Sequence, residues 1–269
     1  MHSILKGLQN KLSNLRSWFN KPQSRGQSLV ELALVLPVMI LMLLGIVEIS
    51  LFMGRYLDVL DLTREAARMA SINDPAIPTA TQLDCSKGEF TDFYFKAACI
   101  FSPPVVTGGV YQDSHFKGGF NRYINFDIHQ DDVVISIYSV KGNGSTASVE
   151  RVWPSETPGY WALSTNGFSQ AHSNWNYSCD DNPAARTLDA AAKPQFTKAS
   201  ILPLLQNDFG APAARAFVAV EAYYCYKWVL NIPVFTNLVP NPVRIHAYTL
   251  MPIPAAQPTR APTSTTTGP

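Results

Sequence analysis

One apolar stretch near the start of the chain dominates the sequence: Leu29–Met53, LVELALVLPVMILMLLGIVEISLFM. Within it, the 16 residues Leu32–Val47 carry no polar side chain. A helix of these 25 residues would be about 37 Å long, because each residue adds roughly 1.5 Å. About 20 apolar residues suffice to cross a bilayer. The stretch therefore predicts a membrane-spanning helix.

The charges beside this stretch predict its orientation. Residues 1–26 contain five basic side chains and no acidic one, namely Lys6, Lys11, Arg16, Lys21 and Arg25. Positive charge beside a membrane helix is retained on the cytoplasmic side, so we expect a cytoplasmic N-terminus and an exterior C-terminal part. A cleavable secretory signal is the alternative. It fits less well, because the apolar run is at the long limit for such signals and no small-x-small cleavage site follows it.

Composition narrows the function classes. Over 269 residues, Lys+Arg 21 nearly balance Asp+Glu 20, which does not suit a nucleic-acid binder. The length favours one folded domain with appendages. The sequence has no Gly-x-Ser-x-Gly elbow, Walker loop, His-Glu-x-x-His helix or dinucleotide fingerprint, so we expect no enzyme and no cofactor.

Three residues inside the apolar segment need an explanation: Glu31, Pro37 and Glu48. The two glutamates are 17 residues apart, about 26 Å along a helix, so each can lie near one membrane interface. Glu48 either reaches into the outer headgroups or contacts a neighbouring helix. Pro37 removes a backbone donor and is expected to kink or locally melt the helix.

The residues just before the apolar run resemble a processing site. Arg25-Gly26-Gln27, with Glu31 five residues after the glycine, resembles the prepilin peptidase site of the type IV pilin class. The resemblance implies cleavage between Gly26 and Gln27, with Glu31 as the fifth mature residue. Cleavage would leave a charged amine beside the bilayer, where the Glu31 carboxylate of the same or an adjacent subunit could neutralise it.

The wider stretch Arg25–Ser71 resembles the TadE-like family of tight-adherence (Flp) pilus assembly proteins. It has the basic-Gly-x-Ser-x-x-Glu opening, the proline in the apolar run, an acidic residue near Gly45 to Ile49, and the closing sequence Arg-Glu-Ala-Ala-Arg at 64–68. The resemblance implies a minor pilin or pseudopilin-like component acting in pilus assembly and surface adhesion. Its partners would be other pilin subunits, membrane pilus-assembly components, prepilin peptidase and membrane lipid, with no nucleic acid.

Two other readings remain open. One is an uncleaved, membrane-anchored surface-binding protein, and the other is a membrane-tethered exterior hydrolase. The expected location is the cell membrane, crossed once, with incorporation into a surface pilus for the pilin reading. Only the pilin reading requires cleavage after Gly26.

The predicted fold class is α+β: a long N-terminal membrane-spanning helix continues into an exterior antiparallel β-sheet domain with a long irregular insert. Apolar residues at spacings of three and four predict that the helix continues over 55–71 and stops at Asn73-Asp74-Pro75. The expected parts are a basic cytoplasmic leader (1–26), the transmembrane helix (27–54), the exterior domain (55–251) and a disordered Pro/Thr-rich tail (252–269).

Alternating polar and β-branched or aromatic residues predict the strands. They indicate a hairpin of 123–129 with 133–140, a turn at Asn143-Gly144, and two later strands at 216–228 and 243–251. Residues 188–208 are expected to be partly helical because Pro194 and Pro203 interrupt them. Residues 141–187 are expected to form a long loop region.

The four cysteines, Cys85, Cys99, Cys179 and Cys225, all follow the apolar segment, as suits an oxidising exterior. Three pairings are possible, and we favour the sequential one, Cys85 with Cys99 and Cys179 with Cys225. Zinc is disfavoured because there is no Cys-x-x-Cys and the histidines are scattered, so no metal site is expected.

Two groups in the insert allow more than one reading. Asp180, Asp181 and Asn182 could bind calcium but are equally typical of a turn. An aromatic group could form a sugar-binding or adhesive surface, or simply a core; its members are Trp153, Tyr160, Trp161, Trp175 and Tyr177.

Overall fold

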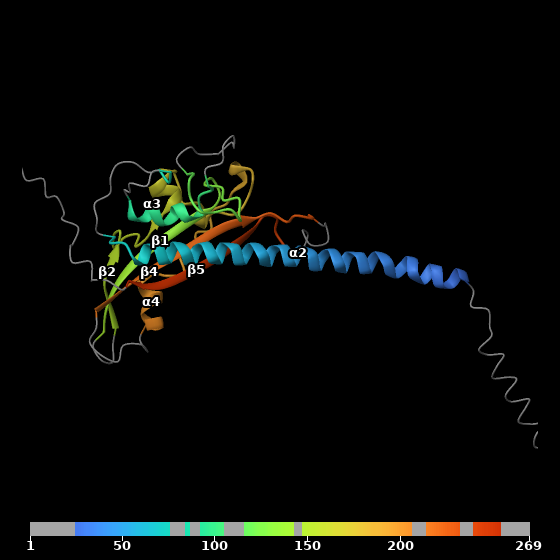
Figure 1. The fold of residues 1–269 in the computed structure, drawn as a ribbon, viewed down its shortest axis with the longest axis horizontal. Coiled ribbons are helices and arrows are strands. Elements are labelled where there is room, and N and C mark those ends of the chain that lie inside the picture. Colours follow the sequence, from blue (N-terminus) through green and yellow to red (C-terminus); the bar gives the residue numbers. More distant parts are fainter. Residues whose placement is uncertain are drawn as a thin grey trace, which may run out of the picture. The chain divides into compact units, whose positions relative to one another are not determined.

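The computed structural model describes residues 25–75, 84–86, 92–104, 116–142, 147–205, 214–231 and 239–253 (Figure 1). The chain divides into two compact units, 1–49 and 50–269. Helix α2, Arg25–Ser71, is 47 residues long and contains residues of both units. We describe each unit by itself.

Helix α2 is continuous. Pro37 lies inside it without interrupting it, so the local melting expected from the sequence does not occur. The predicted continuation to Ser71 is confirmed. The end is capped by Asn73, whose side-chain amide donates to the Met69 carbonyl and whose backbone N–H donates to the Ala70 carbonyl. These bonds satisfy carbonyls that a helix end leaves without intrahelical partners.

The second unit is built on an antiparallel sheet with the strand order β2-β1-β4-β5, and β3 pairs with β1 beyond the end of β2. This arrangement confirms the α+β fold class. The strand bounds are β1 Asp132–Gly142, β2 Ala147–Trp153, β3 Trp161–Ala162, β4 Ala214–Tyr226 and β5 Val243–Ile253.

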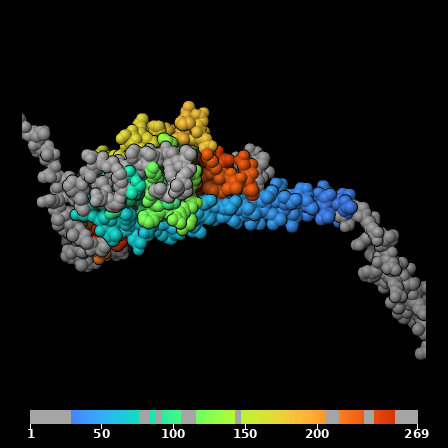
Figure 2. Space-filling model, turned by 45° about the horizontal axis from the view of Figure 1, so that its top comes forward, coloured from blue at the N-terminus to red at the C-terminus, as the bar shows by residue number. Residues whose placement is uncertain are grey.

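The second half of α2 belongs to the core of this unit. Val59, Ala66 and Ala67 are fully buried and share one hydrophobic cluster with Ile135 and Val220 of the sheet. Because the alanine side chains are small, the helix backbone can approach the sheet closely. Helix α3, Phe93–Ala98, contributes to the same cluster. Figure 2 shows α2 and segment 116–142, in green, meeting on one face of the unit.

The other face of the sheet has its own cover. Helix α4, Lys198–Leu205, buries Ile201 in a second cluster with Tyr138 and Phe217. Tyr138 also donates its hydroxyl to the Phe196 carbonyl at 2.6 Å. Because both faces are covered, β1 and β4 are buried on both sides. The short helices are η1 Cys99–Phe101, η2 Leu163–Gly167, η3 Asn174–Asn176 and η4 Pro183–Ala185.

The predicted strand at 123–129 is wrong. Its apolar residues Ile124, Phe126 and Ile128 are buried in alternation, as a strand would require. Its backbone is nevertheless held by side chains: Asn121 accepts from the Ile124 N–H, and Asp131 accepts from the Asp127 N–H. Side-chain hydrogen bonds of this kind compete with the sheet ladder. The segment is therefore irregular, and β1 forms its hairpin with β2 instead.

The prediction of a long loop region over 141–187 needs correction, because strands β2 and β3 lie within this range. The predicted turn at Asn143-Gly144 lies outside the described residues. Residues 188–208 were predicted to be partly helical. Helix α4 covers part of this range: it starts after Pro194 and contains Pro203. Strand β5 extends two residues into the segment expected to be a tail, and residues 254–269 lie outside the described part.

Candidate assembly helix and its junction with the sheet

The first half of α2 exposes its apolar side chains on all sides. Leu29, Leu34 and Met42 have 67%, 72% and 65% of their surface exposed. In the part of the chain that the structure describes, α2 is the one helix long and apolar enough to cross a membrane. A helix that is apolar all round needs lipid or other apolar helices around it.

The residues expected to act in processing and assembly lie along this half. Gly26 and Gln27 are in the first turn of α2, and Glu31 follows one turn later with its side chain exposed. Pro37 lies within the exposed part. Glu48 differs from Glu31 and Pro37 because only 2% of its surface is exposed.

An aromatic and basic junction begins one turn after Glu48. The Phe52 ring lies 5.4 Å from the Tyr226 ring and 5.8 Å from the Trp228 ring, measured between centroids. Arg55 donates to the Tyr123 carbonyl and pairs with Asp58 at 3.3 Å. The ring contacts and the bond to Tyr123 join residues far apart in sequence, and sequence reasoning missed them, whereas the Arg55–Asp58 pair follows from helical spacing.

Beyond the junction, the outer face of α2 carries short-range ion pairs. Arg64 pairs with Asp61 at 3.2 Å and Arg68 with Glu65 at 2.9 Å, and all four side chains are exposed. Exposed pairs of this spacing contribute only about 0.3–0.5 kcal/mol each. The Arg-Glu-Ala-Ala-Arg sequence thus combines a solvated ion pair with two buried alanines.

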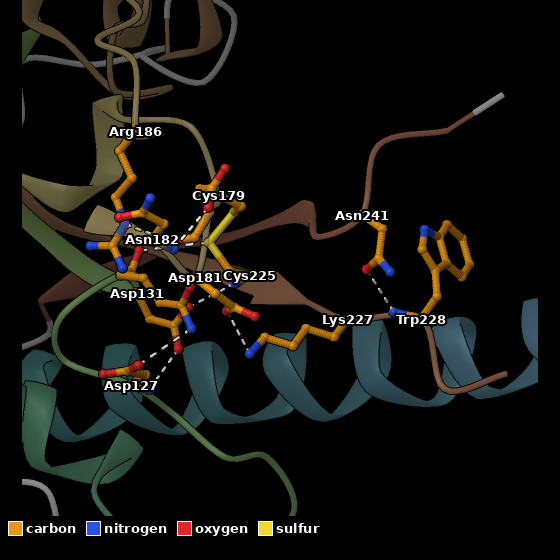
Figure 3. A network of polar contacts seen from close by, with 12 residues as sticks. Asp127, Asp131, Cys179, Asp181, Asn182, Arg186, Cys225, Lys227, Trp228 and Asn241 are labelled. Carbon is orange, nitrogen blue, oxygen red and sulfur yellow. Dashed lines mark hydrogen bonds and ion pairs between the residues drawn. A yellow bond between two sulfur atoms is a disulfide. The ribbon is translucent and has the colours of Figure 1, made fainter. Parts of the chain in front are cut away.

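Two disulfides tie the second unit together. Cys85 bonds to Cys99 and Cys179 bonds to Cys225, which is the sequential pairing. The backbone N–H of Cys225 donates to the Asp131 carboxylate at 2.7 Å (Figure 3). The second disulfide therefore joins the insert to the central strand β4 beside a fully buried carboxylate.

Buried carboxylates organise the insert. Asp132 accepts hydrogen bonds from the backbone N–H groups of Val133, Ser164 and Trp175 and from the Ser164 hydroxyl. Burial raises the pKa of the Asp132 carboxyl, although the bonds from Ser164 oppose this rise. Burial likewise raises the pKa of Asp131 well above its usual value.

Glu221 has a similar role on the neighbouring strand β4, where it pairs with Val134 of β1. Its carboxylate accepts from the backbone N–H groups of Gln195 and Phe196 and from the Tyr223 hydroxyl. His246 Nε2 lies 2.9 Å from the same carboxylate. These bonds hold the segment before α4 against the sheet. The Glu221 side chain is only 1% exposed, so a substrate could not reach the carboxylate in this structure.

The alternative sites in the insert have structural roles here. Asp180 accepts from the Asn182 N–H within a turn, and Asp181 pairs with Lys227 at 2.5 Å. Trp153, Trp161 and Trp175 are each at most 5% exposed and belong to the core. Among the described residues, no group of three or more His, Cys, Asp or Glu side chains is placed to hold a metal ion.

Comparison with known proteins gives one match. Residues 26–68 match the family model described as TadE-like protein, which confirms the resemblance drawn from the sequence. No curated protein and no solved structure matches the chain. The match lies entirely within α2 and implies involvement in assembly of the Tad pilus, and this family is not known for enzymatic activity.

Proposed function

We propose that the chain is a minor pilin or pseudopilin-like component of a tight-adherence pilus. It is inserted through α2, cut after Gly26 and joined to other pilins through the apolar surface of the mature helix. The observation that carries this proposal is the exposure of apolar side chains all around the first half of α2. Such a surface is stable in lipid or against the apolar helices of neighbouring subunits.

The proposed orientation follows from charge. The basic leader 1–26 stays in the cytoplasm, and the sheet-bearing unit lies outside the cell membrane. The two disulfides of that unit suit an oxidising compartment. Lipid, prepilin peptidase, other pilin subunits and membrane assembly components are the partners, and surface adhesion is the outcome of assembly.

The position of Gly26 suits cleavage. It lies in the first turn of α2, where backbone N–H groups have no intrahelical acceptor, so this turn can unwind at low cost. Glycine then lets the backbone enter a protease site in extended form. Cleavage places the new amine at Gln27, one turn from Glu31.

N-terminal sequencing of the chain co-expressed with its peptidase tests this proposal. The mature chain should begin at Gln27, and Gly26→Val should block cleavage because a β-branched side chain crowds and stiffens the scissile site. Gly54→Val is the matched control: it is the same substitution in the same helix, and a Cβ at Gly54 meets no atom within 4 Å. Its cleavage should be normal.

The same experiment distinguishes the pilin proposal from the second candidate function, an uncleaved, membrane-anchored surface-binding protein. A chain that keeps Met1 in the presence of active peptidase would contradict the pilin proposal. It would instead support a permanently anchored surface protein.

A further inference from the structure

The junction on α2 lies at a defined distance along the helix from the apolar run. Phe52 follows Glu48 by four residues, about 6 Å of helix. A bilayer has an interfacial layer about 5–7 Å thick on each side of its hydrocarbon core. With Glu48 at the outer edge of the core, Phe52 and the two rings packed on it, Tyr226 and Trp228, lie in that layer. Trp and Tyr are enriched there.

The segment that follows β4 exposes apolar side chains at this same place. Val229 is 63% exposed and Leu230 is 39% exposed, directly after Trp228. Trp228 itself packs on Phe52 of α2, with 5.8 Å between the ring centroids. We call Trp228, Val229 and Leu230 the β4 tip. Adjacent apolar side chains on a surface mark an interaction site more often than single ones do.

The β4 tip is fixed in place. The Trp228 indole N–H donates to the Pro240 carbonyl at 3.0 Å, and its backbone N–H donates to the Asn241 side chain at 3.2 Å (Figure 3). Asn241 also donates to the Asn231 side chain at 2.9 Å. Before the tip, Lys227 pairs with Asp181. The apolar surface is therefore held in one conformation before it meets a partner.

A basic group of α2 lies one turn further along the helix, next to a second one from another segment. Arg55 and Arg122 line an open hollow together with Tyr123, whose surface is 61% exposed. Arg55 follows Phe52 by three residues, about 4–5 Å. Guanidinium groups bind phosphate through paired hydrogen bonds. Along α2, the apolar groups at the level of Phe52 come first and the arginines follow. A bilayer surface has the same order, because the phosphates lie outside the ends of the acyl chains.

We propose that the β4 tip is a second membrane contact: Trp228, Val229 and Leu230 seat in the outer interfacial layer of a phospholipid bilayer, with Arg55 and Arg122 at the level of the phosphates. This inference rests on the proposed insertion of α2. A single helix leaves the unit outside free to tilt. A fixed apolar tip beside the helix holds that unit against the membrane surface until the subunit is withdrawn into a pilus.

Site-specific photo-crosslinking in proteoliposomes tests the proposal. The full chain, carrying a photoreactive phenylalanine at one position, is reconstituted in phosphatidylethanolamine–phosphatidylglycerol vesicles containing labelled lipid. The test positions are Val229 and Leu230. Leu43, 58% exposed in the apolar run, is the positive control, and Leu204, 56% exposed on α4, is the matched negative control.

We expect lipid labelling at Val229 and Leu230 to exceed that at Leu204 several-fold and to approach that at Leu43. Labelling at the Leu204 level, with Leu43 labelled, would overturn the membrane contact and leave the anchor intact. Failure at Leu43 as well would overturn the insertion of α2 and the contact with it. Crosslinks from Val229 to a second protein chain in place of lipid would assign the tip to a subunit interface and refute the proposal.

Discussion

Glu31 is a charged side chain one turn from the proposed new N-terminus and among exposed apolar residues. A carboxylate drawn unpaired to bilayer depth costs on the order of 2.5–3.5 kcal/mol, so a positive partner such as a mature amine would stabilise it. We predict that Glu31→Gln leaves membrane insertion, the exterior fold and cleavage after Gly26 in place and lowers the yield of crosslinks to pilus subunits.

Glu65→Gln is the control for this variant. It also removes a carboxylate from α2, but one that is exposed and paired with Arg68 outside the apolar run. Its crosslinking should equal that of the wild type. Glu31→Gln subunits that crosslink at wild-type yield would show that the carboxylate does not pair during assembly.

Asp132 is a second residue whose charge has structural consequences. It is fully buried and accepts four hydrogen bonds. Asp132→Asn should lower the free energy of unfolding by about 2–3 kcal/mol, because the amide group has one acceptor oxygen and faces donors with its NH₂. Chemical denaturation of the full chain in detergent, followed by tryptophan fluorescence, measures this loss.

Asp180→Asn is the comparison for Asp132→Asn, because Asp180 accepts the Asn182 N–H through one oxygen at an exposed turn. Its midpoint should stay near that of the wild type. Equal midpoints for the two variants would mean that the Asp132 bonds do not stabilise the fold.

The functional residues that could be predicted from the sequence are those marked by a pattern of neighbouring residues. Gly26 and Glu31 follow from a spacing of five, and the TadE-like match over 26–68 rests on the same local pattern. Asp132 and Glu221 could not be predicted as organising residues, because their main partners lie 32 and about 25 residues away. For Glu221, its place as an acidic residue between Val220 and Ala222 in a predicted strand was the available signal, whereas Asp132 follows Asp131 and has no such flank.

At the level of elements, the two disulfides differ in the length of chain that they close. Cys85–Cys99 spans 14 residues and Cys179–Cys225 spans 46. The chain-entropy model gives about 3 and about 4 kcal/mol for such loops, through restriction of the unfolded chain. We predict that replacing the Cys179–Cys225 pair by serines lowers stability more than replacing the Cys85–Cys99 pair.

Non-reducing peptide mapping of protein taken from the exterior compartment should first show both bonds, and denaturation of the two double-serine variants then ranks them. Four free thiols would contradict the pairing. A larger loss for the Cys85–Cys99 variant would mean that local packing outweighs loop entropy.

The strands show where periodicity is a reliable signal. Strands β4 and β5 lie within two residues of their predicted bounds, because their β-branched and aromatic residues pair directly with neighbouring strands. Residues 123–129 carry the same alternation without a strand, since Asn121 and Asp131 bind their backbone. Alternation thus predicted burial correctly, whereas the hydrogen-bond partners depended on side chains outside the pattern.

For the whole molecule, the buried carboxyls predict how stability depends on pH. Burial raises the native pKa of Asp131 and Asp132 above the unfolded value of about 3.9. Between the two values the native state binds more protons than the unfolded state. Their contribution to the free energy of unfolding is therefore fully present below about pH 4 and is lost as pH rises through the native pKa.

Denaturation midpoints measured over a pH series for wild type and Asp131→Asn check this sign. The wild type should lose stability with rising pH more steeply than the variant, which has no proton to release at this position. Identical pH slopes would show that Asp131 ionises normally in the native state.

The unbroken course of α2 has a consequence for biosynthesis. Its second half supplies Val59, Ala66 and Ala67 to a core whose other wall includes β4, and β4 begins at Ala214. At about 5–20 residues per second, the ribosome needs roughly 7–30 s to pass from the end of α2 to that strand. The anchor helix is thus made first and the central strand late. If the chain has the orientation proposed above, the small apolar face of α2 has no sheet to meet until β4 has crossed the membrane, so folding of this unit would follow translocation rather than accompany it.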